Sequence, residues 1–162
     1  MQTHYLSRNG YQRLQQRKQE LLDSIKAKKK QMGDSVAIDN DLRENSEFMQ
    51  LRTEVTYVLP KKLDEVDSIL RSYQIIEDMP SFIYSHFYKV QLGAKVTVQY
   101  QDGKVVPFTI LGYDEADFDK NIISYLSPLA QSLIGGVVGD EIEVEVPGKP
   151  IRVRILNIEK GI

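Results

Sequence analysis

Apolar side chains in the first part of the chain recur at the spacing of an α-helix. The series begins after Ser7, a residue type that caps helix starts, and its successive intervals are three, seven, four and seven residues. Its members are Tyr11, Leu14, Leu21, Ile25 and Met32. A seven-residue repeat is typical of a helix that packs along one partner helix. The pattern therefore predicts a long first helix with a single apolar seam.

A second apolar series follows at intervals of three and four residues. It consists of Phe48, Leu51, Val55, Leu59, Leu63, Val66, Leu70 and Tyr73. Three consecutive intervals of four exceed the seven-residue repeat by one residue, so the apolar stripe should drift around the helix there. Pro60 lies in that stretch, and a proline inside a helix removes one hydrogen bond and bends the axis. We therefore predict one kinked second helix rather than two separate helices.

Residues 33–40 separate the two patterns and are rich in the glycine, aspartate, serine and asparagine of turns and caps. Helices joined by a short connection run antiparallel, so the first half predicts a helical hairpin. At about 1.5 Å per residue, a second helix over residues 42–73 would be roughly 48 Å long. We expect the hairpin to project as a finger with an acidic connection at its far end.

The second half changes to strand-like alternation. Two β-hairpins are predicted, around turns at residues 101–104 and 147–149. Their strands are residues 94–100 with 105–111, and residues 141–146 with 151–156. A short helix between them begins at Pro128 and ends at Gly135. This half therefore predicts a compact antiparallel sheet with one helix.

Together the two halves predict an α+β fold with two domains. Residues 1–78 form an antiparallel coiled-coil hairpin with an acidic tip, and residues 79–162 form the sheet domain. We expect a flexible joint between them, near residues 78–81.

Composition excludes several classes of site and location. The 162 residues include no cysteine and two histidines, which excludes disulfides and thiolate nucleophiles and nearly excludes a histidine-rich metal site. No apolar run is long enough to span a bilayer, and residues 1–6 do not look like a secretory signal, so we expect a cytoplasmic protein. The net charge of −2 hides a strong separation of sign. Residues 8–30 carry eight basic and two acidic side chains, whereas residues 34–47 carry five acidic and one basic.

Two carboxylates of the acidic stretch, Asp41 and Glu44, are spaced by one helical turn. An acid at a helix cap with a glutamate three residues later is a capping arrangement, which is one interpretation. The other is that both carboxylates point outward and hold a hard cation such as Mg²⁺. Because two carboxylates make a weak site, a partner would then have to supply the remaining ligands.

Two other charged stretches have mainly structural interpretations. The run Lys28–Lys30 is typical of a solvated helix face, with nucleic-acid contact as the alternative. Residues 114–119 predict an acidic surface turn in which Phe118 is tucked into the core.

Several motifs resemble those of the bacterial Gre transcript cleavage factors. Residues 41–48, Asp-Leu-Arg-Glu-Asn-Ser-Glu-Phe, resemble the family's tip signature, GDLSENAEY. Residues 114–118 and 123–130 resemble its DEADF and IS..SP.A motifs, and residues 133–135 and 139–140 continue the pattern. The resemblance covers essentially the whole chain and keeps the motifs in their expected order.

The resemblance implies a fold, a partner and an activity. The fold would be a coiled coil followed by a domain like the FK506-binding proteins, and the partner bacterial RNA polymerase. The coiled coil would enter the polymerase's secondary channel, where the tip acids help the polymerase to cleave backtracked nascent RNA. The Mg²⁺ would be held only within the polymerase active centre, with none in the isolated protein. The chain would be a monomer and a cofactor protein, not itself an enzyme.

Residue by residue, the resemblance assigns Asp41 to metal coordination and Glu44 to coordination or orientation of a water molecule. Contacts to RNA or polymerase would come from Lys28, Lys29 and Arg52. Polymerase docking would involve Ser127, Pro128 and Leu129, for which simple burial is the alternative.

Some positions depart from the family pattern. Asn40 stands where the family usually has glycine, Phe48 where it has tyrosine, and Gly33 and Pro60 are unusual in helices. A related regulator that occupies the channel without promoting cleavage is therefore the alternative function. A prolyl isomerase or chaperone with a helical arm is a third, which would need an aromatic-lined pocket.

Overall fold

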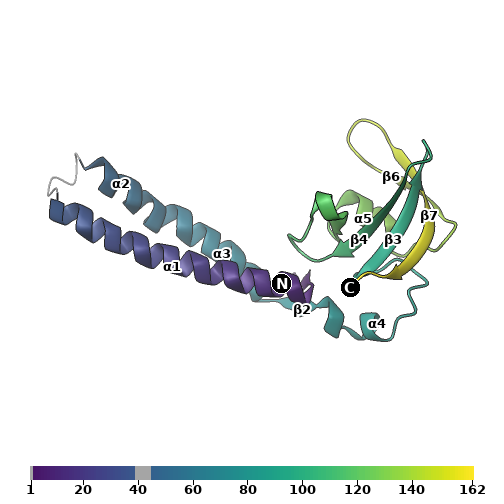
Figure 1. Cartoon of the computed structure of the whole chain (residues 1–162), viewed down its shortest axis with the longest axis horizontal. Coiled ribbons are helices and arrows are strands. Elements are labelled where there is room, and N and C mark those ends of the chain that lie inside the picture. Colours follow the sequence, from purple (N-terminus) through teal and green to yellow (C-terminus); the bar gives the residue numbers. More distant parts are fainter. Residues whose placement is uncertain (1, 39–44) are drawn as a thin grey trace. The chain divides into compact units, whose positions relative to one another are not determined.

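The computed structural model describes residues 2–38 and 45–162 (Figure 1). Their contacts divide the chain into two compact units. Gln12–Ser72 forms a helical unit, and the residues up to Tyr11 join Tyr73–Ile162 in a sheet unit. The predicted α+β fold, with an N-terminal helical hairpin and a C-terminal sheet carrying a short helix, is confirmed.

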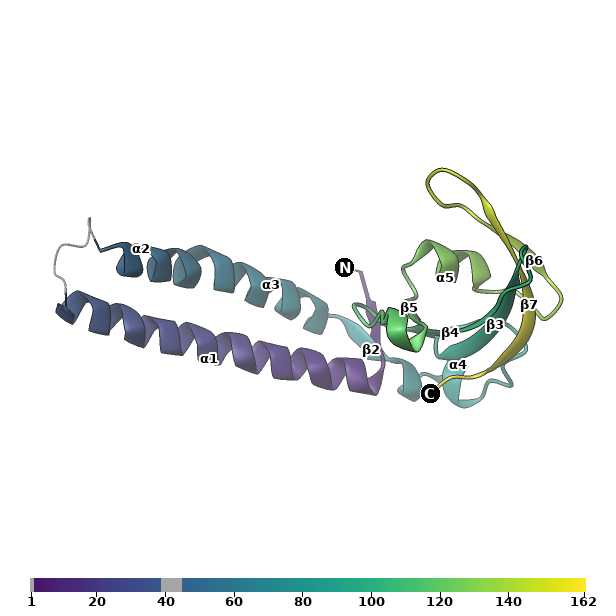
Figure 2. The same cartoon turned by 45° about the horizontal axis from the view of Figure 1, so that its top comes forward.

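The hairpin pairs one long helix with a composite second one. Helix α1 spans Arg8–Ile38. The returning arm consists of α2 (Ser46–Thr53), the π-helical segment η1 (Glu54–Val58) and α3 (Leu59–Leu70). Figures 1 and 2 show this arm running alongside α1. The apolar seam is confirmed, because its members are buried or half-buried, with Leu14, Leu51, Leu59 and Val66 below one tenth exposure.

Two lysines fill the seven-residue gaps in the seam of α1. Lys18 lies between Leu14 and Leu21, and its Nζ is 2.7 Å from Asp67 Oδ1 on α3. Lys28 lies in the next gap, with its Nζ 2.7 Å from Glu54 Oε2. Each pair crosses from one arm of the hairpin to the other with side chains about one third exposed. Ion pairs at seam positions favour one register of the two arms over its neighbours.

The end of α1 differs from the sequence prediction. Residues 33–38, which we expected in the connection, continue the helix. A glycine in a helix costs about 1 kcal/mol relative to alanine, so Gly33 weakens but does not stop it. The last turns are held by Ser35, which is buried against Asn45 on the other arm.

Replacing Gly33 by alanine is expected to stabilise the helical unit by about 0.5–1 kcal/mol. Gly33 has no positive φ, and a Cβ built there meets nothing within 4 Å. The alanine therefore lowers the entropy of the unfolded chain without a clash. Urea unfolding followed by circular dichroism would measure the gain in stability. Gly103→Ala should instead lower stability, because Gly103 lies in a turn with a positive φ.

A π-helical turn lies just before Pro60 in the returning arm. The Leu59 N–H donates to the Glu54 carbonyl five residues back, which is a π-helical bond. Such a turn holds one residue more than an α-helical turn, so it absorbs the extra residue in the spacing. Leu51, Val55 and Leu59 therefore stay on the inner face, and Pro60 falls in the first turn of α3. The arm ends at Leu70, so Tyr73 is not helical.

The sheet unit is built around five strands in the order β5-β4-β3-β7-β6. The strands are β3 (Ala94–Tyr100), β4 (Val105–Leu111), β5 (Ile122–Ser124), β6 (Glu141–Val144) and β7 (Ile151–Lys160). Neighbours are antiparallel except β4 and β5. Both predicted hairpins and the short helix α5 (Pro128–Leu133) are confirmed. The core lies under β3, β4 and β7 and includes Val96, Ile110, Leu133 and Ile155, all fully buried.

The N-terminal residues pack into this sheet unit rather than into the hairpin. Strand β1 (His4–Leu6) pairs in parallel with β2 (Tyr73–Ile75), followed by the 3₁₀ turn η2 (Ile76–Asp78) and α4 (Pro80–Ile83). Leu6 and Ile76 are fully buried, and the Tyr113 N–H donates to the Tyr5 carbonyl at 2.7 Å. The predicted boundary at residue 78 groups β1, β2 and η2 with the hairpin and α4 with the sheet domain. Over the described residues, no helix combines the length and apolar character needed to cross a membrane.

Candidate functional site

The described chain reaches the predicted acidic tip from both sides. Helix α1 ends at Ile38, and α2 begins at Ser46 after its cap, Asn45. The two carboxylates predicted to act there, Asp41 and Glu44, lie outside the described residues, so their roles stay predictions.

A buried polar pair joins the two arms next to this segment. Asn45 Oδ1 accepts from the Phe48 N–H at 2.9 Å and from the Ser35 hydroxyl at 3.1 Å. The Asn45 amide also donates to the Ser35 carbonyl at 3.2 Å. Both side chains are below one tenth exposure, so their hydrogen bonds form away from water. The pair caps α2 and ties its first turn to the last turns of α1.

Replacing Asn45 by alanine is expected to destabilise this end of the hairpin by about 1–2 kcal/mol. The change removes the α2 cap and leaves the buried Ser35 hydroxyl without its acceptor. Hydrogen exchange of the Phe48 amide would report the loss directly. Gln50→Ala, an exposed change on the same helix, provides the control, and equal protection in both variants would contradict the prediction.

The three predicted basic contact residues differ in their surroundings. Lys28 is ion-paired with Glu54 in the seam, so its ammonium already links the two arms of the hairpin. Lys29 and Arg52 are exposed on α1 and α2. The structure thus separates one lysine with a structural partner from two cations that face solvent.

The three predicted docking residues lie at the start of α5. Ser127 caps this helix, with its Oγ accepting from the Ala130 N–H at 3.2 Å. Pro128 is exposed, whereas Leu129 is half-buried against the core. Ser127 and Leu129 therefore have structural contacts, Pro128 lies on the surface, and the docking role stays a prediction.

The turn at residues 114–119 buries a different side chain from the predicted one. Phe118 is 89% exposed, so the expectation that it enters the core is wrong. Glu115 is buried instead, and its Oε2 accepts from the N–H groups of Ser7 and Gly112, both at 2.8 Å. Its Oε1 accepts from the Ser7 hydroxyl, which in turn accepts from the Gly10 N–H at 2.9 Å in the first turn of α1. Nothing local in an acidic run distinguishes the acid that meets these distant donors.

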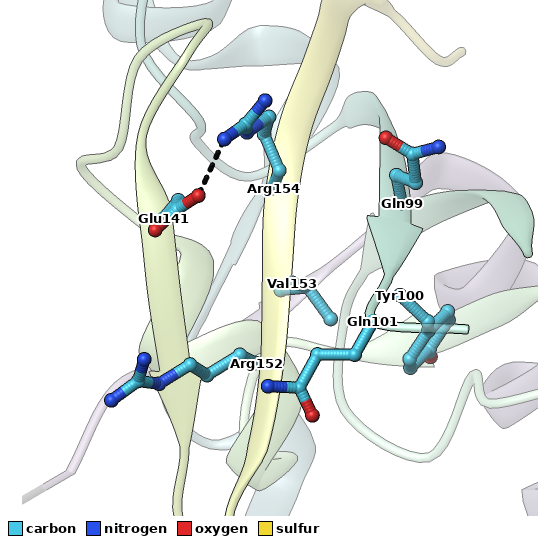
Figure 3. Close-up of a pocket in the computed structure, with 7 residues that line it drawn as sticks. All are labelled: Gln99, Tyr100, Gln101, Glu141, Arg152, Val153 and Arg154. Atoms are coloured by element: carbon cyan, nitrogen blue, oxygen red, sulfur yellow. Dashed lines mark hydrogen bonds and ion pairs between the residues drawn. The ribbon is translucent and has the colours of Figure 1, made fainter. Parts of the chain in front are cut away.

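A pocket of about 270 Å³ opens on the β3–β7–β6 face of the sheet (Figure 3). Its cations are matched by acids, since Arg154 lies 2.5 Å from Glu141 Oε1 and Arg152 lies 3.8 Å from Glu143 Oε2. Burial, followed by the Asp102 charge, raises the pKa of Tyr100 at its edge. The charged side chains that line the pocket are therefore paired, and the raised pKa keeps Tyr100 neutral near pH 7.

The described parts of the chain, 2–38 and 45–162, contain no group of three His, Asp or Glu side chains placed to hold a metal ion.

Comparison with known proteins decides the family. A family model described as "Transcription elongation factor, GreA/GreB, C-term" matches residues 86–160. The transcription elongation factor GreA of Oceanobacillus iheyensis is 34% identical over 170 residues, covering 97% of both chains. The chain belongs to the GreA/GreB family of transcription elongation factors. GreA of Bacillus licheniformis is also similar, with 38% identity over 119 residues, 73% of this chain and 72% of that one.

Solved structures of GreA/GreB relatives show weaker similarity. Gfh1 (GreA factor homolog 1) of Thermus thermophilus is 20% identical, with 98% of this chain and 99% of that chain covered and a TM-score of 0.42.

Membership in the GreA/GreB family rests on both halves of the chain. The family model lies within the sheet unit and includes Ser127, Pro128 and Leu129. The full-length match to GreA extends the similarity through the hairpin, where Asp41 and Glu44 lie.

Proposed function

We propose that this chain acts on bacterial RNA polymerase and stimulates the polymerase's own cleavage of backtracked nascent RNA. Family membership along the whole chain carries this proposal. The hairpin would enter the secondary channel and bring Asp41 and Glu44 to the active centre. The buried Ser35–Asn45 pair supports the role, because it anchors both sides of the segment that holds these acids.

The proposed chemistry divides the work between two proteins. Asp41 and Glu44 would add ligands to a Mg²⁺ of the polymerase centre, where two-metal hydrolysis activates water and stabilises the leaving oxygen. Asp41 would coordinate the Mg²⁺, and Glu44 would either coordinate the Mg²⁺ or orient the attacking water molecule. Lys29 and Arg52, both exposed, would attract the phosphates of the extruded RNA without reading its sequence.

The remaining contacts belong to docking. Ser127, Pro128 and Leu129 at the start of α5 would contact the polymerase surface, with Pro128 the exposed member. The chain would act as a monomeric cofactor protein and would turn over no substrate by itself.

A purified backtracked elongation complex tests the proposal. Adding the protein should release short RNA from the 3′ end and leave a shortened transcript that the polymerase can extend again. The protein without polymerase should leave the same RNA intact. A complex that binds the protein but keeps its full-length RNA would overturn the proposal.

Inhibition of polymerase without cleavage is the second candidate function. It is favoured by the residues that depart from the family pattern near the tip, Asn40 and Phe48, because a shift of about 1 Å in the carboxylates is enough to impair catalysis. In the same assay this function would slow elongation of an active complex and produce no shortened RNA.

A further inference from the structure

A short segment of the sheet unit displays large side chains that its fold does not bury. Within Ile83–Lys89, here named the aromatic segment, Tyr84 is 79% exposed, Tyr88 is 78% exposed and Ile83 is 55% exposed. His86 is exposed as well, with its ring centroid 5.6 Å from that of Tyr88. Single exposed apolar residues are common, but several within one short segment mark an interaction surface.

The aromatic segment is held in place rather than left loose. Phe87 has a φ of 54°, a left-handed conformation that is uncommon for a bulky residue, and its side chain is buried edge-to-face against Phe82. Its N–H donates to Ser85 Oγ at 2.9 Å, and the Ser85 hydroxyl donates to Gln91 Oε1 at 2.8 Å. Because these contacts order the aromatic segment before a partner binds, binding costs less conformational entropy.

The aromatic segment is continuous with the helix proposed for docking. Lys89 forms a β-bridge with Val137, and Val90 exchanges backbone hydrogen bonds with Gly135 and Gly136, at 2.8 and 2.9 Å. This second stretch, just after α5, exposes three further apolar side chains: Ile134, Val137 and Val138. Phe82 and Ile134 also line one cavity of about 230 Å³. The backbone thus connects the aromatic segment through residues 134–138 to α5, which begins at Pro128.

The charged residues near this surface limit the kind of partner that could bind it. Residues 79–92 contain no acidic side chain, although the chain as a whole has a net charge of −2. Their one lysine is Lys89, and the Lys160 ammonium lies 4.9 Å from the centroid of the Phe82 ring. Residues 134–138 are bordered by an acid, because Asp140 Oδ2 accepts from the Val137 N–H at 3.0 Å, so the positive edge belongs to the aromatic segment. An apolar, aromatic segment with a positive edge complements a protein surface that is apolar at its centre and acidic at its rim.

We propose that polymerase docking extends beyond Ser127–Leu129, across residues 134–138, onto the aromatic segment, where Tyr84 and Tyr88 are the main anchors. This inference rests on the proposed function, since it assigns the partner to be RNA polymerase. Tyrosine is enriched at the energetically important positions of protein interfaces, because it buries a large area at a low entropy cost.

The test compares a double change of exposed tyrosines with a single change of another exposed aromatic residue. Tyr84→Ser with Tyr88→Ser should raise the Kd for bacterial RNA polymerase core enzyme about tenfold or more. Phe118→Ser, which removes an even more exposed ring from another turn of the same unit, should leave the Kd unchanged. Lys89→Glu should lower the association rate and flatten its dependence on salt.

The outcomes separate this inference from the proposed function. If the wild type binds polymerase and the double tyrosine variant binds it equally tightly, the inference alone is overturned. Wild-type protein that does not bind polymerase overturns both. Tyrosine-dependent binding of a labelled single-stranded RNA without polymerase would assign the surface to nucleic acid and overturn protein docking. Tyrosine-dependent dimers in sedimentation would assign it to a second copy, with the same consequence.

Discussion

Replacing Asp41 by Asn and Glu44 by Gln in one chain is expected to lower stimulated transcript cleavage about a hundredfold or more. The amides keep the shape of the side chains but remove both negative charges, so the proposed Mg²⁺ ligation loses its strongest contributors. Binding to polymerase should change little, because the proposed docking residues lie in the sheet unit. Rates of RNA shortening in a backtracked complex, measured at saturating protein, would isolate the catalytic effect.

The control removes the same charge from the same end of the hairpin. Asp34→Asn with Glu47→Gln changes two exposed acids that flank the tip on α1 and α2. This control should retain cleavage within a few-fold. If both double variants lose cleavage equally, a general negative field is responsible and not ligation by Asp41 and Glu44.

Helix content distinguishes ligation from capping in the same variants. Asn45 is the cap of α2 and accepts from the Phe48 N–H, so the helix has its capping side chain without Asp41 or Glu44. Circular dichroism of the Asp41/Glu44 variant should therefore match the wild type. Lost helicity would support the capping interpretation, under which reduced cleavage would follow from a damaged hairpin.

Periodic burial made much of the fold predictable from sequence. The apolar series located both arms of the hairpin, and strand alternation with turn residues located the β3–β4 and β6–β7 hairpins. The seven-residue gaps in α1 contained further information. Lys18 and Lys28 occupy seam positions, and each found an acid on the other arm. A lysine in an apolar repeat therefore predicts an acidic partner across the seam.

The sequence did not predict features that depend on contacts distant in the sequence, or on local signals that packing overrides. The extra residue near Pro60 was visible in the spacing, but a drifting stripe and a π turn satisfy the same count. Gly33 suggested a turn, yet packing of Ser35 on Asn45 extends the helix past it. Strands β1 and β2 have three residues each, too few to show alternation. The roles of Asp41 and Glu44 remain predictions from the family resemblance.

The buried acid of the 114–119 turn likewise depends on a partner that is distant in the sequence. Glu115 meets Ser7, 108 residues away in the sequence, and accepts hydrogen bonds from its N–H and its hydroxyl. Glycines stand where this carboxylate is closest, since a Cβ at Gly10 or Gly112 would overlap it. The arrangement fixes the cap of α1 and the end of β4 to one side chain.

Glu115→Ala is therefore expected to destabilise the sheet unit by about 3 kcal/mol or more, because three buried donors lose their acceptor together. Glu115→Gln keeps one acceptor oxygen but turns an NH₂ group toward the donors, so it should lower stability less than Glu115→Ala does. Asp119→Ala, an exposed change in the same turn, should stay within about 0.5 kcal/mol. Hydrogen exchange of the Ser7 and Gly112 amides measures this unit separately from the hairpin. Equal protection in the Glu115 and Asp119 alanine variants would mean that water replaces the carboxylate at little cost. The start of α1 would then be held by its other contacts, such as the bond from the Arg8 N–H to Glu77 Oε2 at 2.9 Å.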